Sequence, residues 1–314
     1  MAQPAGDPYW YSKVLGIHCD GANNSTTFTD VKGKTVTAAG NAKISTAQYP
    51  SLTGKTSSAY FDGSGDYLTV PDSNDWNFGT GDLTIRFWCY PTTTGADREF
   101  IAHRNNAETS FWYVRQTSTD KVQVGAVVSA TVVTVVDSTN SLSINAWNFV
   151  EVVRTAASVK VSIGGTFATT VTTDASSSWP SASTSVLYVG VAHNGLSDPY
   201  SGYMSDIEIY KGAALHTANF TPPTVPFPNT YVQVSGVTKD AGGNFASRLV
   251  RVYRQDTGAF VGEQLSNGTT GEYVITAANT GATVTKHFAI MHDDDANPPT
   301  TSENAIIYDN ITPY

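Results

Sequence analysis

The stretch AYFDGSGDYLTVP, residues 59–71, decides between two different kinds of protein. Oxygen-bearing side chains stand at alternate positions from Asp62 onward, as they do at the start of an EF-hand calcium loop. Such a loop also needs glycine at its sixth position and a bidentate glutamate at its twelfth, but these positions hold Tyr67 and Ser73. The flanking residues alternate as strands do, and the two glycines before Asp66 permit a tight turn. The stretch therefore predicts a hairpin connection between two strands.

The same alternation with a period of two residues runs through most of the chain. In LTIRFWCYP, residues 83–91, every second residue from Leu83 onward is apolar, which predicts a strand with one buried face. Residues 148–154 and 158–163 are further expected strands, and the glycine pair at residues 164–165 suits a two-residue hairpin turn. Many short strands with tight turns and no helical patterns between them predict an all-β fold, an antiparallel sandwich.

The composition limits the classes of function. The chain has 314 residues, enough for two domains that each bury a core, and only 14% of its residues are charged. Its net charge is −9 and it has no basic run, which argues against nucleic acid and anionic membranes as partners. No stretch of about 20 apolar residues predicts a membrane span, and the first residues lack the pattern of a signal peptide. Cys19 and Cys89 lie in apolar strand patterns, so we expect buried free thiols and synthesis in a cytoplasm.

A proline-rich segment at residues 221–230 divides the chain. Proline fixes φ and removes a backbone donor, so this segment cannot continue a central strand and predicts a semi-rigid linker. It separates a first sandwich over residues 14–220 from a smaller one over residues 231–314. Before the first sandwich, residues 1–13 predict an extended arm that docks on a neighbouring subunit.

Several strings, taken in their order along the chain, resemble a known family. They are VLGIHCDGANN, SAYFDGSGDYLTV, LTIRFWCYP, WNFVEVVR, LYVGV and GYMSDIEIYKGAALHTANFTPP. Over residues 7–223 they resemble a laminin-G-like, concanavalin A-like jelly-roll domain, in versions common in bacteriophage tail and fibre proteins. Cys19 and Cys89 depart from that pattern, because such domains more often carry a bulky apolar residue there. The remaining chain looks like a small immunoglobulin-like or transthyretin-like sandwich that recurs at the ends of phage tail proteins.

Catalytic residues are not expected. Glycoside hydrolases with concanavalin A-like folds need two carboxylates about 5–10 Å apart across one sugar. The chain has no Glu-x-Asp-x-x-Glu-like pattern, no serine-nucleophile elbow and no His-Glu-x-x-His motif. Asp206 and Glu208 are expected on one strand face, but the pair opens no such motif. A polysaccharide-degrading tail enzyme is therefore the less favoured alternative.

The resemblance implies one structural calcium ion (Ca²⁺), held by an aspartate of the last strand and by oxygens near the first strand. Asp206 in GYMSDIEIY matches that aspartate, and Asp20 in HCDGANN lies in the partner region. A hard cation needs six or more oxygens, of which backbone carbonyls can supply several. The alternative is that Asp206 caps a hairpin and Asp20 begins a turn.

Glycan binding in lectin-like sandwiches uses loop aromatics and neighbouring polar groups. The candidates share a loop-like setting: Trp112, Trp179, His193, Asn194, Asp198 and Tyr200. The alternative for the tryptophans is a place in the core.

The two resemblances imply a phage virion protein of the tail, fibre or decoration type, made in the host cytoplasm, and the absence of catalytic motifs predicts that it is non-enzymatic. Its jelly roll would bind a host-surface glycan or other virion subunits in an oligomeric assembly. A purely architectural virion protein without any ligand is the alternative. Exposure of the aromatic residues in the assembled particle would distinguish the two.

Overall fold

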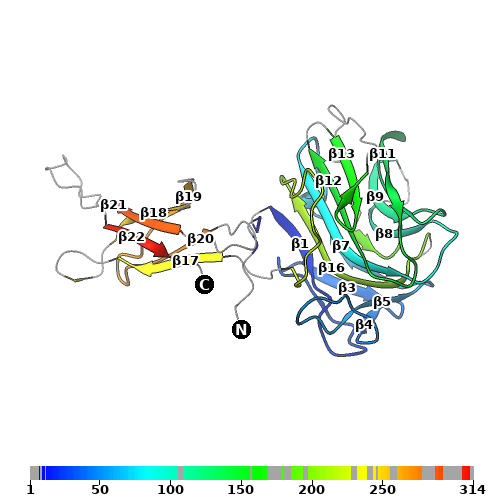
Figure 1. Cartoon of the computed structure of the whole chain (residues 1–314), viewed down its shortest axis with the longest axis horizontal. Helices are drawn as coiled ribbons and strands as arrows, with labels where there is room; N and C mark the ends of the chain where they lie inside the picture. Colours follow the sequence, from blue (N-terminus) through cyan, green and yellow to red (C-terminus); the bar gives the residue numbers. More distant parts are fainter. Residues whose placement is uncertain are drawn as a thin grey trace. The chain divides into compact units, whose positions relative to one another are not determined.

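The computed structural model divides into two compact units, Tyr11–Phe227 and a second unit that combines Met1–Trp10 with Pro228–Tyr314. Both units are built of antiparallel strands (Figure 1). The structure describes residues 7, 9–10, 12–104, 109–155, 158–168, 179, 185–193, 197–227, 232–238, 243–244, 247–254, 260–277, 287–292 and 306–311. The all-β fold class predicted from the alternation is confirmed.

The first unit is a sandwich of two sheets (Figure 1). The first sheet has the order β14-β13-β12-β7-β16-β5-β4, and β1 also pairs with β16. Its strands are β1 (Lys13–Ile17), β4 (Lys43–Ser45), β5 (Ser58–Asp62), β7 (Leu83–Pro91), β12 (Asn148–Thr155), β13 (Ser158–Ile163), β14 (Thr166–Phe167) and β16 (Ser201–Lys211). The predicted glycine hairpin is confirmed, because β13 and β14 pair Ile163 with Thr166.

The second sheet has the order β11-β10-β9-β8-β15-β6-β3-β2. Its strands are β2 (Phe28–Thr29), β3 (Thr35–Ala39), β6 (Tyr67–Val70), β8 (Arg98–His103), β9 (Phe111–Gln116), β10 (Lys121–Val128), β11 (Thr131–Ser141) and β15 (Leu187–Val189). A 3-10 turn, η1 (Asn74–Trp76), follows β6 and is capped by the Ser73 side chain. In the described part of the chain, no helix has the length and apolar character needed to cross a membrane.

The core lies between the two sheets. Leu83, Ile85, Phe87 and Cys89 of β7 are all fully buried, as the alternation predicts. Phe87 meets Phe100 of the opposite sheet with ring centroids 5.0 Å apart. Both cysteines are buried free thiols, and desolvation raises the pKa of Cys19 to about 12. They act as apolar core residues.

The turn after β5 differs from the predicted hairpin. β5 pairs with β4 and β16 in the first sheet, whereas β6 pairs with β3 and β15 in the second. The chain crosses here between the sheets, so the hairpin prediction is wrong. Buried Asp66 holds the crossing, because its carboxylate accepts from the backbone N–H groups of Asn41 and, at 2.9 Å, of Asp62. Alternation identifies the buried face of a strand but not its partner.

The chain after β16 returns over the outer face of the first sheet. The rings of Phe220 and Phe227 lie 5.9 Å and 6.0 Å from that of Phe149 in β12. The carbonyl of Thr224 accepts from the backbone N–H of Thr53 at 3.1 Å. The first part of the predicted linker at residues 221–230 is therefore packed against the first unit, whose boundary falls after Phe227. Proline suits this role because it covers a sheet without pairing with it.

The predicted arm at residues 1–13 is divided. Met1–Trp10 are grouped with the second unit, while Lys13 begins β1 of the first sheet. Docking of this segment on a neighbouring subunit stays a prediction.

The second unit contains two antiparallel sheets, with the orders β17-β20 and β19-β18-β21-β22. Its strands are β17 (Val232–Val237), β18 (Leu249–Arg254), β19 (Phe260–Leu265), β20 (Glu272–Ala277), β21 (His287–His292) and β22 (Ile306–Ile311). Its β character follows the prediction. An immunoglobulin-like topology stays a prediction.

Candidate functional site

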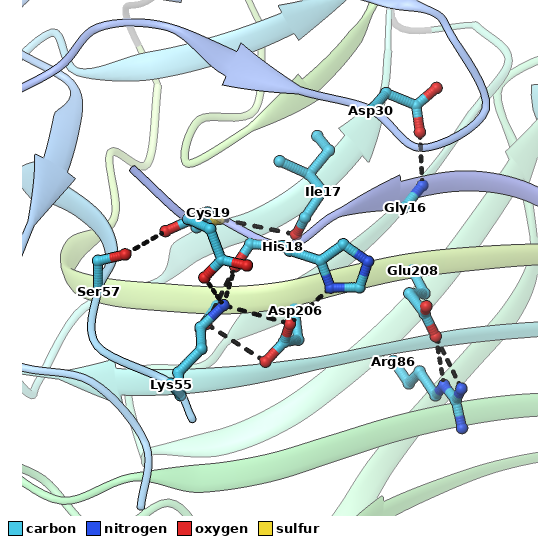
Figure 2. A network of polar contacts seen from close by, with 12 residues as sticks. Gly16, Ile17, His18, Cys19, Asp30, Lys55, Ser57, Arg86, Asp206 and Glu208 are labelled. Atoms are coloured by element: carbon cyan, nitrogen blue, oxygen red, sulfur yellow. Dashed lines mark hydrogen bonds and ion pairs between the residues drawn. The ribbon is translucent and has the colours of Figure 1, made fainter. Parts of the chain in front are cut away.

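Two strands share one edge of β16. β5 pairs with residues 201–204 of β16, and β1 pairs with residues 207–210. Asp206 stands between these stretches, at a shift in register, with a φ of +49°. A bulge re-aims a side chain, and the Asp206 carboxylate points toward the residues that follow β1 (Figure 2). The structure thus places Asp206 near Asp20, the two residues that the family resemblance associates, since both carboxylates contact Lys55.

The ammonium of Lys55 contacts both of these aspartates, and Figure 2 shows the Lys55 side chain beside Asp206. Its Nζ donates to the carbonyl oxygen of His18 and, at 2.8 Å, to Asp20 Oδ1, and it lies 3.3 Å from Asp206 Oδ1. His18 Nδ1 lies 2.8 Å from the same oxygen of Asp206. The side chains of Lys55 and Asp206 are fully buried, whereas that of Asp20 is 62% exposed. We call these four residues the Lys55 cage.

The electrostatics of the cage do not suit calcium. Burial alone would lower the pKa of Lys55, but the carboxylates of Asp206 and Asp20 outweigh it and raise this pKa above its usual value. The ammonium therefore stays charged, and the oxygens that would bind a metal already face it. Among the described residues, no group of three or more His, Cys, Asp or Glu side chains is placed to hold a metal. The residues do not fit a calcium ion as they stand, and calcium binding stays a prediction from sequence.

Glu208, the second acid of this strand, has its own cations. Its carboxylate accepts from Lys13 Nζ, from Arg86 Nη2 at 2.7 Å and from Tyr210 Oη at 2.7 Å. Burial alone would raise the pKa of Glu208, but Arg86 and Lys13 outweigh it and hold this pKa below its usual value. Asp206 and Glu208 face different partners, so they do not form an acid pair around one sugar (Figure 2).

Three residues predicted to bind glycan lie in the core, so that part of the prediction is wrong. Trp112, Trp179 and Tyr200 each have 0% exposure. The indole N–H of Trp112 donates to the Trp76 carbonyl at 2.9 Å, and that of Trp179 to Thr134 Oγ1 at 3.1 Å. Rings packed in this way have no face left for a sugar.

Of the other predicted residues, His193 and Asp198 are partly exposed, and Asn194 lies outside the described residues. The carbonyl of Asp198 accepts from the backbone N–H of Glu99 in β8 at 2.8 Å. The Glu99 side chain is fully buried, and neither carboxyl oxygen has a hydrogen-bond partner. Burial raises the pKa of Glu99 to about 8, against the lowering effect of Arg115 and Arg104. Burial therefore favours the protonated, uncharged form of this carboxyl group.

A different set of aromatic side chains lies partly exposed on the outer face of the first sheet. Tyr203 of β16 pairs with Tyr60 of β5 on one side and with Tyr90 of β7 on the other, and Trp147 immediately precedes β12. The distances between neighbouring ring centroids are 5.0 Å for Tyr60–Tyr203, 5.8 Å for Tyr203–Tyr90 and 5.6 Å for Tyr90–Trp147. Partial burial, with Tyr60 and Tyr90 nearby, raises the pKa of Tyr203, so its phenol stays neutral. We call these four residues the aromatic strip.

One end of the strip opens into a polar hollow of about 380 Å³. Its lining combines amides and charged groups with one ring: Asn24, Thr26, Gly40, Asn41, Lys43, Tyr60 and Asp62. Lys43 Nζ lies 5.9 Å from the centre of the Tyr60 ring, and Asn41 Nδ2 lies 3.5 Å from Asp62 Oδ2. Aromatic faces beside amide and carboxylate groups are what an apolar sugar face and its hydroxyls require.

The sequence predicts that two of these side chains point outward, but it does not predict that the four rings lie next to one another. Alternation assigns Tyr60 and Tyr90 to the outward faces of their strands. Only the register between β5, β16 and β7 makes them neighbours of Tyr203. The prediction favoured loop residues, whereas three of the four rings lie on strands.

The sequence was compared with models of known protein families and with curated protein sequences. A family model described as the concanavalin A-like lectin/glucanases superfamily matches residues 62–218. Curated protein sequences give no match.

Three solved structures are similar to the chain. The binding domain of Paraclostridial Mosquitocidal Protein 1 has a TM-score of 0.51 at 12% identity, over 95% of this chain and 75% of that one. The botulinum neurotoxin serotype G binding domain has a TM-score of 0.49 at 11% identity, over 91% and 73%. Domain 4 of AbnA, an extracellular arabinanase of Geobacillus stearothermophilus solved with arabinotriose, has a TM-score of 0.48 at 15% identity, over 65% and 95%. At this identity, the likeness to the mosquitocidal protein shows a shared fold.

Proposed function

The chain belongs to the concanavalin A-like lectin/glucanase superfamily, and on this premise we propose that its first unit binds a glycan without cleaving it. The observation that carries the proposal is the aromatic strip that opens into the polar hollow. Its rings offer apolar faces to a sugar, while Asn41, Lys43 and Asp62 offer donors and acceptors to hydroxyl groups. Partly exposed aromatic residues in such a row are available to a ligand without any change in the core.

Binding without cleavage is supported by the state of the acids. Cleavage with two carboxylates needs one on each side of the scissile bond. Among the residues that line the hollow, Asp62 is the one acid. Asp206 and Glu208 are buried and bonded to lysine and arginine side chains. Reducing-end release from a host polysaccharide would contradict this part of the proposal.

The setting that we propose is a phage virion, where the first unit contacts a host-surface glycan and the second unit contacts other virion subunits. This setting is supported by the resemblance of residues 7–223 and of the C-terminal strings to phage tail and fibre domains. Labelling of assembled particles with antibodies to the outer face of the first sheet tests it. Accessible labelling fits an adhesion role, whereas labelling only after disassembly favours the purely architectural alternative.

A glycan array with the full chain, followed by calorimetry on each hit, tests the binding site. We expect Tyr203→Ala to lose binding because the central part of the strip is removed. Tyr188→Ala is the matched control, since Tyr188 is also partly exposed and meets Tyr67 with ring centroids 6.0 Å apart, but on the second sheet. An array without hits, or equal losses in both variants, would overturn the proposal.

A further inference from the structure

We propose that Lys55 supplies the cation that closes the junction between β1, β5 and β16, so that the first unit needs no metal ion there. Its ammonium meets oxygens from three points of the chain: the His18 carbonyl, Asp20 Oδ1 and Asp206 Oδ1. These are the oxygen types that a hard divalent cation takes as ligands. The inference is independent of glycan binding, because the cage shares no residue with the aromatic strip or the hollow.

Negative charge lies at the junction because Asp206 stands between the stretches of β16 that pair with β5 and β1. β5 and β1 follow one another along its edge, and the bulge between them aims Asp206 into the gap. Asp206 and Cys19 both have left-handed backbones, with φ of +49° and +60°. Non-glycine residues adopt this conformation at a cost and persist in it only where the surrounding contacts hold them. A positive charge in the gap supplies such contacts and offsets the two carboxylates.

The fold positions Lys55 from both sides of its own segment. Its backbone N–H donates to the Leu52 carbonyl at 3.0 Å. Two residues later, Ser57 Oγ donates to the Cys19 carbonyl at 3.1 Å and so ties the segment to the residues after β1. The side chain enters the cage fully buried. A cation that is covalently part of the chain is present in every molecule, whereas a bound metal depends on concentration.

Removal of the Lys55 ammonium should turn the cage into a metal site. Lys55→Ala removes the ammonium and its stem but leaves the carbonyl and both carboxylates around the vacated space. Calcium or terbium then has oxygen ligands and room, and waters can complete the shell. The variant should gain a metal dependence that the natural protein lacks.

The test is thermal unfolding of the full chain in EDTA and in millimolar calcium. The natural protein should melt at one temperature in both. Lys55→Ala should melt roughly 10 °C lower in EDTA, because the buried carboxylate of Asp206 and the exposed carboxylate of Asp20 lose their cation. Calcium should restore part of this loss. Lys55→Met, which fills the space without a charge, should be destabilised and should not respond to calcium. Lys160→Ala is the matched control, since Lys160 donates to a backbone carbonyl at the surface.

Three results would overturn the proposal. One is a rise in the melting temperature of the natural protein with calcium, because the proposal leaves that protein without a metal dependence. Another is a melting temperature of Lys55→Ala equal to that of Lys160→Ala. The third is a destabilised Lys55→Ala that binds no calcium or terbium by titration. If Lys55→Ala does not fold, the calcium titration of the natural protein and the response of Lys55→Met still decide the matter.

Discussion

The Lys55 cage and the aromatic strip use the same strand for opposite purposes. Tyr203 and Asp206 are three positions apart in β16, but the first is partly exposed and the second is fully buried. The cage matches charges inside the fold, where an unmatched charge is costly. The strip holds neutral rings at the surface, where their loss costs the fold little. We therefore expect a change in the cage to destabilise the first unit, whereas a change in the strip should alter what the unit binds.

The largest expected effect is in the cage. Asp206→Asn keeps the shape and tolerates the left-handed backbone, so that it removes only the charge beside Lys55. We expect the free energy of unfolding to fall by about 3 kcal/mol, because the buried ammonium loses its buried partner. Denaturant unfolding measures the change. Asp62→Asn in the hollow is the control and should stay within about 0.5 kcal/mol. Equal losses in the two variants would break the comparison.

Glu99 is a buried acid of a different kind, because its carboxyl oxygens have no hydrogen-bond partner and Arg104 Nη1 lies 3.9 Å from Oε1. Because its folded-state pKa of about 8 lies above its usual 4.5, the folded chain holds an extra proton between these values. Stability contributed by this group is therefore lost as the pH rises from 4.5 to 8. Glu99→Gln should remove that loss and be more stable than the natural protein at pH 8, by about 2 kcal/mol, with similar stability near pH 4.5. Unfolding curves at several pH values test this, and parallel curves for both proteins would contradict it.

In the strip, Tyr90→Ala removes the ring that bridges Tyr203 and Trp147. We expect glycan affinity to fall about tenfold, with a small change in stability. Tyr90→Phe keeps the ring and should bind nearly as well as the natural protein. Calorimetry against the best glycan from the array measures both variants. If Tyr90→Ala failed to fold, the strip would be shown to stabilise the fold, as the cage is expected to do.

The smallest effect is expected at the edge of the hollow. Asp62→Asn replaces a charged acceptor with a neutral one and should weaken glycan binding about threefold. The same variant serves as the neutral control for stability, so one protein reports on both regions. A large loss of stability without a loss of binding would show that Asp62 stabilises the fold and does not bind the glycan.

Much of the fold could be predicted because it depends on local patterns. Alternation predicts the buried positions of β7, and the glycine pair at residues 164–165 predicts the β13–β14 hairpin. The resemblance also implied that Asp206 and Asp20 lie near each other, and both carboxylates contact Lys55. Local patterns do not show which distant strands pair with each other. The turn after Asp62 was predicted as a hairpin, yet it joins strands of opposite sheets.

Local sequence patterns were enough to predict the all-β class, the β13–β14 hairpin and the buried face of β7. These follow from side-chain periodicity and turn chemistry, which act over a few residues. The pairing of distant segments makes Lys55, which lies 151 positions before Asp206, the cation between the two aspartates. It also decided that Tyr60, Tyr90 and Tyr203 form one row while Trp112 and Trp179 lie in the core. The physical reason is register, because neighbours across a sheet depend on pairing between distant strands and not on the residues beside them.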